Sequence, residues 1–128
     1  MDRKDFFEFV ELEYGIKPDY PFSDDTDTAV FRHEINRKWF AIVMSIPREK
    51  LGLSGGGSID IVNLKASPAL IGSVVGDRGF FPAWHMNKDH WLSAALDESA
   101  DGDTLRFITD MSYALTRPRI KKAKASKL

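Results

Sequence analysis

The chain has 128 residues, of which 43% are apolar and 12% aromatic, and this is the size and composition of one folded domain. It has no cysteine, which excludes disulfides, thiolate zinc sites and cysteine nucleophiles. The net charge is only -1, but residues 117–128 hold six bases and no acid, while residues 1–116 hold 12 bases against 19 acids. Any phosphate-binding surface must therefore be a local patch or the basic end of the chain.

The first elements are a helix, a loop and three strands. Asp2 is a plausible N-cap for a helix over 2–14, whose apolar residues fall near one face and which Gly15 ends. No apolar run in this stretch is long enough for a signal peptide or a membrane span, so a cytoplasmic protein without membrane contact is expected. A loop rich in Pro and Asp follows, and then come strands at 28–35, 38–46 and 58–65. The second strand is apolar on both faces, which indicates a central position.

The second half predicts a helix, two strands and a closing helix. Ser67-Pro68 is typical of a helix start and opens a short helix over about 68–75. Strands at 80–86 and 90–96 are joined by a short NKD turn, and the last helix begins at Asp101 or Asp103 and ends at Arg117-Pro118.

The predicted order is α-β-β-β-α-β-β-α, which favours an α+β two-layer sandwich with an antiparallel five-stranded sheet. The first and last helices should pack on the same face of that sheet. Four residues should belong to the core: Phe31, Phe40, Ile42 and Leu105. Residues 1–118 form one domain in this interpretation, and 119–128 form a basic, flexible C-terminal tail.

No catalytic, metal or cofactor site is expected from the residue pattern. His85 and His90 flank the predicted turn, but no third ligand lies near them, and His33 is on an apolar-leaning face. The GLSGGGS segment lacks the ending of a phosphate-binding loop and joins two strands, and no serine sits in a nucleophile elbow. The acidic pairs lie at a loop and a helix start, where capping explains them. The protein is therefore expected not to be an enzyme.

Bases and aromatics gather on the predicted hairpins. Such hairpins can enter nucleic-acid grooves or stack on nucleobases. Aromatic side chains in a core and basic side chains in solvent would give the same sequence pattern. In the nucleic-acid hypothesis, the basic side chains contact phosphates and the tryptophans contact nucleobases or sugars. The basic residues of the C-terminal segment carry most of the affinity. The candidate residues are Arg37, Lys38, Trp39, Arg78, Lys88, Trp91, Arg119, Lys121, Lys122 and Lys124.

Several stretches resemble the MmcQ/YjbR family of small bacterial proteins. They include YGIKPDYPF (14–22), VFRHEINRKWFAIVM (30–44), IDIVNLK (59–65) and GFFPAWHMNKDHW (79–91). The resemblance implies the element order given above and a fold similar to that of type III secretion chaperones, also described as CyaY-like. It also implies a proposed "double wing" mode of DNA binding, an inference by structural analogy.

Two functions from different classes follow. The first is a DNA-binding or DNA-associated accessory protein, and the alternative is a chaperone-like module that binds a protein partner along its sheet. A third possibility is a small-molecule pocket near the FFPAWHM segment. A monomer is expected rather than an oligomer.

Overall fold

Local sequence signals set the ends of the helices. The computed structural model describes residues 1–119 and contains the helices α1 (Arg3–Tyr14), α2 (Pro68–Val74) and α3 (Gly102–Thr116). Asp2, Ser67 and Asp101 are their N-caps, and the side chain of each accepts a backbone N–H of the first turn. Gly15 ends α1 in the left-handed conformation, at φ 68°. None of the helices within 1–119 is long and apolar enough to cross a membrane.

The strands form one antiparallel sheet in the order β1-β2-β3-β5-β4. They are β1 (Ala29–Arg32), β2 (Trp39–Pro47), β3 (Ser58–Lys65), β4 (Phe80–Pro82) and β5 (Trp91–Ala95). A 3-10 turn, η1 (Arg48–Leu51), follows β2. The predicted fold class and element order are confirmed, and β2 is flanked on both sides, as its apolar faces indicated.

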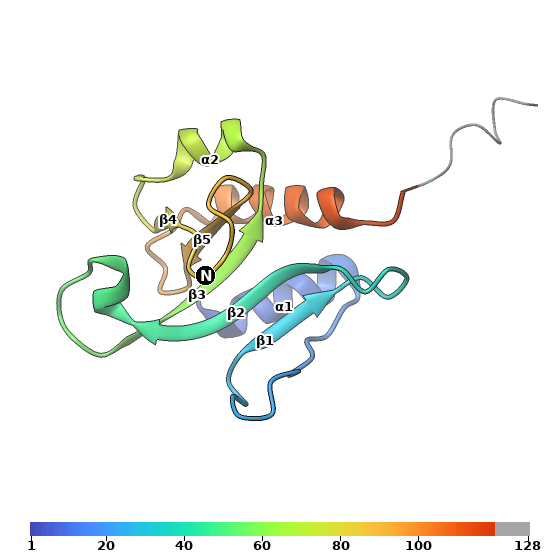
Figure 1. The fold of residues 1–128 in the computed structure, drawn as a ribbon, viewed down its shortest axis with the longest axis horizontal. Coiled ribbons are helices and arrows are strands. Elements are labelled where there is room, and N and C mark those ends of the chain that lie inside the picture. The colour runs from blue at the N-terminus through green and yellow to red at the C-terminus, as the bar shows by residue number, and fades with distance from the viewer. Residues whose placement is uncertain (120–128) are drawn as a thin grey trace, which may run out of the picture.

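One face of the sheet carries the main core. Figure 1 shows α1 and α3 side by side behind the sheet, and their buried residues join those of the strands in a single cluster. Phe31, Phe40 and Leu105 lie in this cluster and are fully buried. Ile42 is also buried, but it faces the opposite side, because it alternates with Ala41 and Val43 along β2. The four predicted core residues are thus confirmed, on two different faces.

Loops cover the opposite face, on which a second, smaller apolar cluster lies. It consists of Ile46, Ile59, Ile61 and Ala95, with partly buried side chains from the 48–53 segment and from residues 81–84 packed against it. The sheet is therefore buried on both sides, by helices on one and by connecting segments on the other.

The predicted strands 80–86 and 90–96 do pair antiparallel, as β4 and β5, but the predicted length of the first strand is wrong. β4 ends at Pro82, and residues 83–90 form a loop over the second face. Side chains of the sheet capture the backbone of this loop: the Ser93 hydroxyl accepts the Trp84 N–H (2.9 Å), and the Asn63 amide donates to the Trp84 carbonyl (2.9 Å). Ser93 also donates to the Asn63 side-chain oxygen (2.5 Å), and both side chains are fully buried. The loop is thus fixed by a buried polar network in place of strand pairing.

Ser112 of α3 bridges β2 and β3 where their pairing stops. The last residue pair at this end of the ladder is Ala41 with Leu64. Beyond it, the Ser112 hydroxyl donates to the Phe40 carbonyl (2.5 Å) and accepts the Lys65 N–H (2.9 Å). Ser112 is fully buried, so water cannot replace it.

We predict that Ser112→Ala lowers the free energy of unfolding by about 2–4 kcal/mol, because it leaves a backbone donor and a backbone acceptor unsatisfied. The matched control is Thr109→Val, one turn earlier and equally buried, since the Thr109 hydroxyl bonds only the Leu105 carbonyl of its own helix. This control should cost less than about 1 kcal/mol. Urea unfolding measures both, and equal losses in the two variants would contradict the bridging role.

A second prediction concerns Gly79, just before β4. Its φ is +86°, and a Cβ placed there would lie 2.5 Å from the backbone nitrogen of Ala100. Gly76 also has positive φ, +105°, but a Cβ there would meet nothing within 4 Å. Both Ala variants carry the backbone strain, about 1–3 kcal/mol, and Gly79→Ala carries the clash in addition. Its loss of stability in a urea titration should exceed that of Gly76→Ala by about 1 kcal/mol or more.

Candidate anion-binding cleft

The turn between β1 and β2 is held in one conformation by its own hydrogen bonds. The first strand was predicted to reach residue 35, but it ends at Arg32. The His33 N–H donates to the Lys38 carbonyl (3.0 Å), and the Arg37 N–H donates to the His33 carbonyl (3.1 Å). The Asn36 side-chain oxygen accepts the Lys38 N–H (3.1 Å). Arg37 has a positive φ of 61°, which closes the turn in place of a continued strand.

Thr116, the last residue of α3, anchors this turn to the helix. The Thr116 hydroxyl donates to the Ser112 carbonyl (2.8 Å), so it must accept the bond from His33 Nε2 (2.8 Å). The Asn36 amide donates to the Thr116 carbonyl (2.9 Å). His33 and Thr116 are both buried. The β1–β2 turn and the end of α3 are therefore joined into one unit by side-chain hydrogen bonds.

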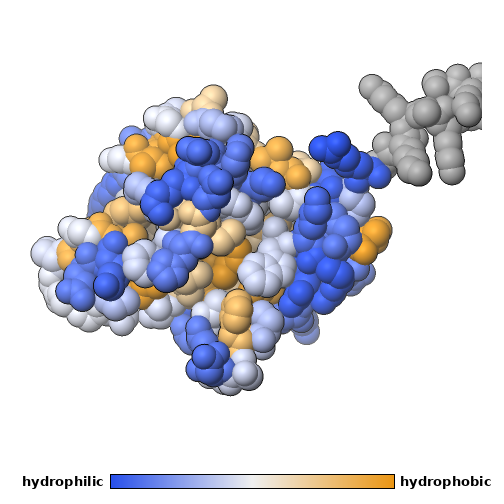
Figure 2. Space-filling view, in the orientation of Figure 1, coloured by the Kyte–Doolittle hydropathy of each residue, from blue (hydrophilic) through white to orange (hydrophobic). Residues whose placement is uncertain are grey.

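A cleft of about 1400 Å³ lies along this unit. Its lining includes four cations from three different segments, namely Lys38, Lys65, Arg117 and Arg119, and one acid, Glu34. Within residues 1–119, none of the four cations forms an ion pair. Figure 2 shows strongly hydrophilic surface over the β1–β2 turn and near the end of α3. The cleft is thus locally cationic in a chain that is slightly acidic.

Two tyrosines form an uncharged wall of the cleft. The rings of Tyr14 and Tyr113 stack with centroids 4.3 Å apart and planes at 14°. Burial, together with the hydrogen bond from the Tyr14 hydroxyl to the Asp110 carboxylate, raises the pKa of Tyr14 far above its ordinary value. The phenol stays protonated, so this wall adds aromatic surface and no negative charge.

His33 adds no charge at neutral pH. Burial lowers its pKa below the ordinary value of 6.5, because an imidazolium ion loses solvation inside the protein. Its Nε2 is committed to Thr116, so the ring serves as a structural hydrogen-bond donor.

The structure separates most of the predicted nucleic-acid residues. Lys38 and Arg119 line the cleft, whereas Arg37, next to it, lies 3.5 Å from the Asp19 carboxylate, which also binds Arg32 at 2.6 Å. Arg78 precedes β4 at the opposite edge of the sheet, and Lys88 lies in the loop 83–90.

The predicted tryptophans lie on strands. Trp39 begins β2 and packs edge-on against Phe22, with the Arg32 guanidinium 5.9 Å from its ring centroid. Trp91 begins β5 opposite Lys65. The expected tail residues Lys121, Lys122 and Lys124 lie outside the described part of the chain.

Sequence reasoning missed Lys65 and the anchoring by Thr116, and it counted Arg117 only as one of the six bases of residues 117–128. A signal for the anchor was present: Ser112 and Thr116 lie four residues apart, on the face of the predicted last helix that carries Leu105 and Ile108. Buried hydroxyls at that spacing indicate polar partners on the facing strands. Nothing local marked Lys65, which enters the cleft only because β3 ends beside the turn.

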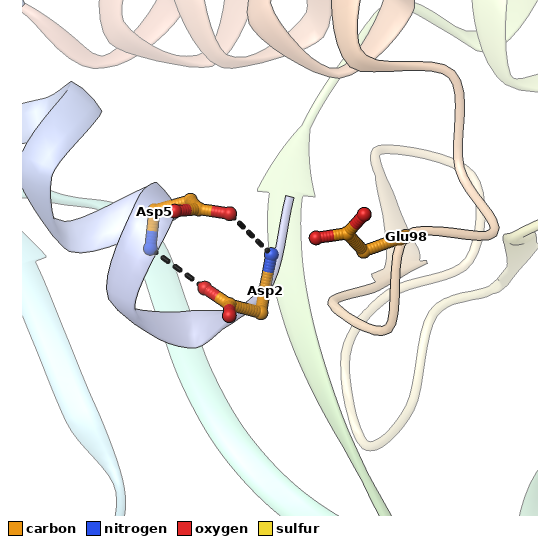
Figure 3. Close-up of side chains that lie close together, drawn as sticks. All are labelled: Asp2, Asp5 and Glu98. Atoms are coloured by element: carbon orange, nitrogen blue, oxygen red, sulfur yellow. Dashed lines mark hydrogen bonds between the residues drawn. The ribbon is translucent and has the colours of Figure 1, made fainter.

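One acidic cluster among the described residues has the spacing of a metal site. Asp2, Asp5 and Glu98 place carboxylate oxygens within 4.8 Å of one another (Figure 3). Asp2 and Asp5 are engaged in the reciprocal cap of α1, and all three residues are exposed. Capping accounts for the first two. No group of this kind within residues 1–119 includes a histidine.

Comparison with known proteins gives a consistent result. The sequence model of the YjbR family matches residues 13–115. The Bacillus subtilis protein YyaQ is 36% identical over 117 residues, which cover 91% of this chain and 99% of that protein.

Two solved structures have the same fold as this chain. A Pseudomonas syringae crystal structure with 39% identity superposes with a TM-score of 0.88, covering 91% of this chain and all of that one. The Deinococcus radiodurans protein DR2400, a DUF419 domain, has 20% identity and a TM-score of 0.68, covering 98% of this chain and 86% of that one. The likeness to DR2400 concerns the fold alone.

The lowered pKa of His33 predicts a pH-dependent stability. Between the folded-state pKa and 6.5, the unfolded chain binds more protons than the folded one. The contribution of neutral His33 to the free energy of unfolding is therefore complete above pH 6.5, and it is lost as the pH falls from 6.5 toward the folded-state pKa. The free energy of unfolding in urea should drop between about pH 7.5 and about pH 5.5. His33→Gln, which keeps an amide donor but does not titrate, should show a smaller drop, and an unchanged drop would refute the assignment.

Proposed function

The chain belongs to the YjbR family, and from its own geometry we propose that it is a DNA-associated binding protein that holds phosphate groups in the cationic cleft. The observation that carries the proposal is the convergence of Lys38, Lys65, Arg117 and Arg119 on one cleft without ion-pair partners in residues 1–119. Cations that are not neutralised by the protein are available to phosphates. Their contacts fix position and carry no sequence information, so binding is expected to be tolerant of sequence.

The placement of the acids supports this role. Nine of the 19 acids fall within residues 1–30, and the part of that segment lining the cleft, residues 14–16, holds none of them. The Asp19 carboxylate forms ion pairs with Arg32 and Arg37. The basic sequence 117–128 begins at the cleft, so that four further bases follow Arg119 along the chain.

The same arrangement supports binding without catalysis. The His33 ring is held by Thr116, and Tyr14 is held by Asp110 with a raised pKa. Neither of these titratable groups in the cleft is poised to exchange a proton near neutral pH. We therefore propose that the cleft binds its ligand and leaves it chemically unchanged.

A protein partner is the second candidate. Ile35 is 85% exposed and Leu115 is 50% exposed, and both line the cleft. Exposed aliphatic side chains beside a cationic groove suit an acidic peptide with apolar residues. This candidate predicts that Ile35→Ser weakens partner binding, whereas duplex binding does not depend on Ile35.

The test is a titration of labelled duplex DNA at several salt concentrations. We expect weak, sequence-tolerant binding, with an affinity that falls steeply as salt rises. Lys38→Gln combined with Lys65→Gln should reduce the slope of log affinity against log salt by about 2, from roughly 0.9 counterions per phosphate contact. The control is Lys4→Gln with Lys17→Gln, which removes the same number of charges from two exposed lysines outside the cleft, of which Lys17 pairs with Glu11. Equal effects of the two double variants on the salt slope would refute the cleft as the DNA-binding site.

A chain ending at Arg119 measures the share of the four remaining bases. If the cleft binds DNA, this chain retains affinity that depends on Lys38 and Lys65. If it loses all binding, the C-terminal bases carry the interaction, and the cleft is not the site. Absence of binding by the full chain at low salt would remove DNA and favour the protein partner.

A further inference from the structure

A second, separate hollow lies on the loop-covered face of the sheet. It has a volume of about 330 Å³ and is formed by η1 on one side and by β4 with the start of loop 83–90 on the other. Its walls are Leu51, Phe81, Pro82, Ala83 and Trp84, and its charged lining residues are Lys50 and Lys88. Figure 2 shows apolar surface between hydrophilic loop side chains on this face.

Both the backbone and the ring of Trp84 are held in place without a ligand, and the ring stacks on His85 with centroids 4.2 Å apart. Both backbone polar groups of Trp84 are bound by the buried pair Asn63 and Ser93. Phe81 lies on a strand and pairs with Ser93 in the sheet, and both aromatic residues pack on the second apolar cluster. A ligand thus meets a preorganised surface and does not have to order it.

The charges of the lining are of one sign. Lys50 and Lys88 are exposed, no acid lines the hollow, and neither lysine forms an ion pair within residues 1–119. Two cations beside an apolar, partly aromatic floor complement a ligand with an apolar body and one anionic group. The volume is at the lower end for ligand sites, roughly 300–1,000 Å³, which suits a small molecule.

We propose that this hollow binds a small aromatic carboxylate, with the ring against Phe81 and Trp84 and the carboxylate between Lys50 and Lys88. Flat aromatic ligands match the two aromatic walls by edge or offset stacking. This proposal is independent of the cationic cleft, because no residue lines both.

The probe is 2-naphthoate, with the neutral 2-naphthamide as its matched analogue. The chain has three tryptophans, so its ¹⁵N NMR spectrum has three indole N–H signals, and Trp84→Phe identifies the one from Trp84. Adding naphthoate should shift the Trp84 signal saturably and leave those of Trp39 and Trp91 in place. Naphthamide should bind about tenfold more weakly, since it lacks the charge-assisted contacts.

Two double variants separate this site from the cleft. Lys50→Gln with Lys88→Gln should lower naphthoate affinity about tenfold and abolish the preference over naphthamide. Lys38→Gln with Lys65→Gln should leave naphthoate binding unchanged while it weakens DNA binding. The proposal is overturned if naphthoate does not move the Trp84 signal, if naphthamide binds equally well, or if the cleft variant loses naphthoate binding.

Discussion

The hydroxyl of Ser112 joins the sheet to α3 at the point where β2 and β3 stop pairing. A ladder that opens inside a core leaves one carbonyl and one N–H without partners, and a single side chain satisfies both. The opening lets the β1–β2 turn reach the last turn of α3, where Thr116 binds it. It also places Lys65 at the end of β3, within the cleft. The cationic cleft therefore depends on two hydroxyl residues spaced four apart on one helix.

The charge distribution shows why an acidic body and a cationic cleft are compatible. Exposed charges are screened over about 8 Å at physiological salt, so a ligand in the cleft responds mainly to the groups that line it. There the bases outnumber the acid Glu34. The acids of residues 1–30 serve local purposes instead: Asp2 and Asp5 cap α1, and Asp19 neutralises two arginines. Net charge is thus a poor guide to the potential at this site.

The sequence predicted what is governed by near neighbours. The caps at Asp2 and Ser67, the start of the last helix at Asp101 or Asp103, and the interior place of β2 all follow from local signals, and the structure contains them, with Asp101 as the third cap. The first strand of the hairpin at 80–96 is shorter than predicted, because the side chains of Asn63 and Ser93 bind the Trp84 backbone in place of the ladder. The cleft was only partly predicted, since Lys65 reaches the bases of the β1–β2 turn and of the C-terminal segment through tertiary contacts that leave no trace in the spacing of the sequence.

The hydrogen bonds from Asn63 and Ser93 to the Trp84 backbone should make the motion of the 83–90 segment differ from that of an ordinary loop. An eight-residue connection normally exchanges its amide hydrogens with solvent rapidly, whereas the Trp84 N–H is bound to a buried hydroxyl of the central sheet. Its exchange then requires the buried bonds among Trp84, Ser93 and Asn63 to break, so we expect this amide to open with the sheet and not with the rest of the loop. Amides such as that of Asp89, bonded only to the exposed Asn87 side chain, open independently. Slow exchange at Trp84 and fast exchange at Asp89 would thus occur within a single connection, whose first part opens with the sheet and whose second part opens by itself.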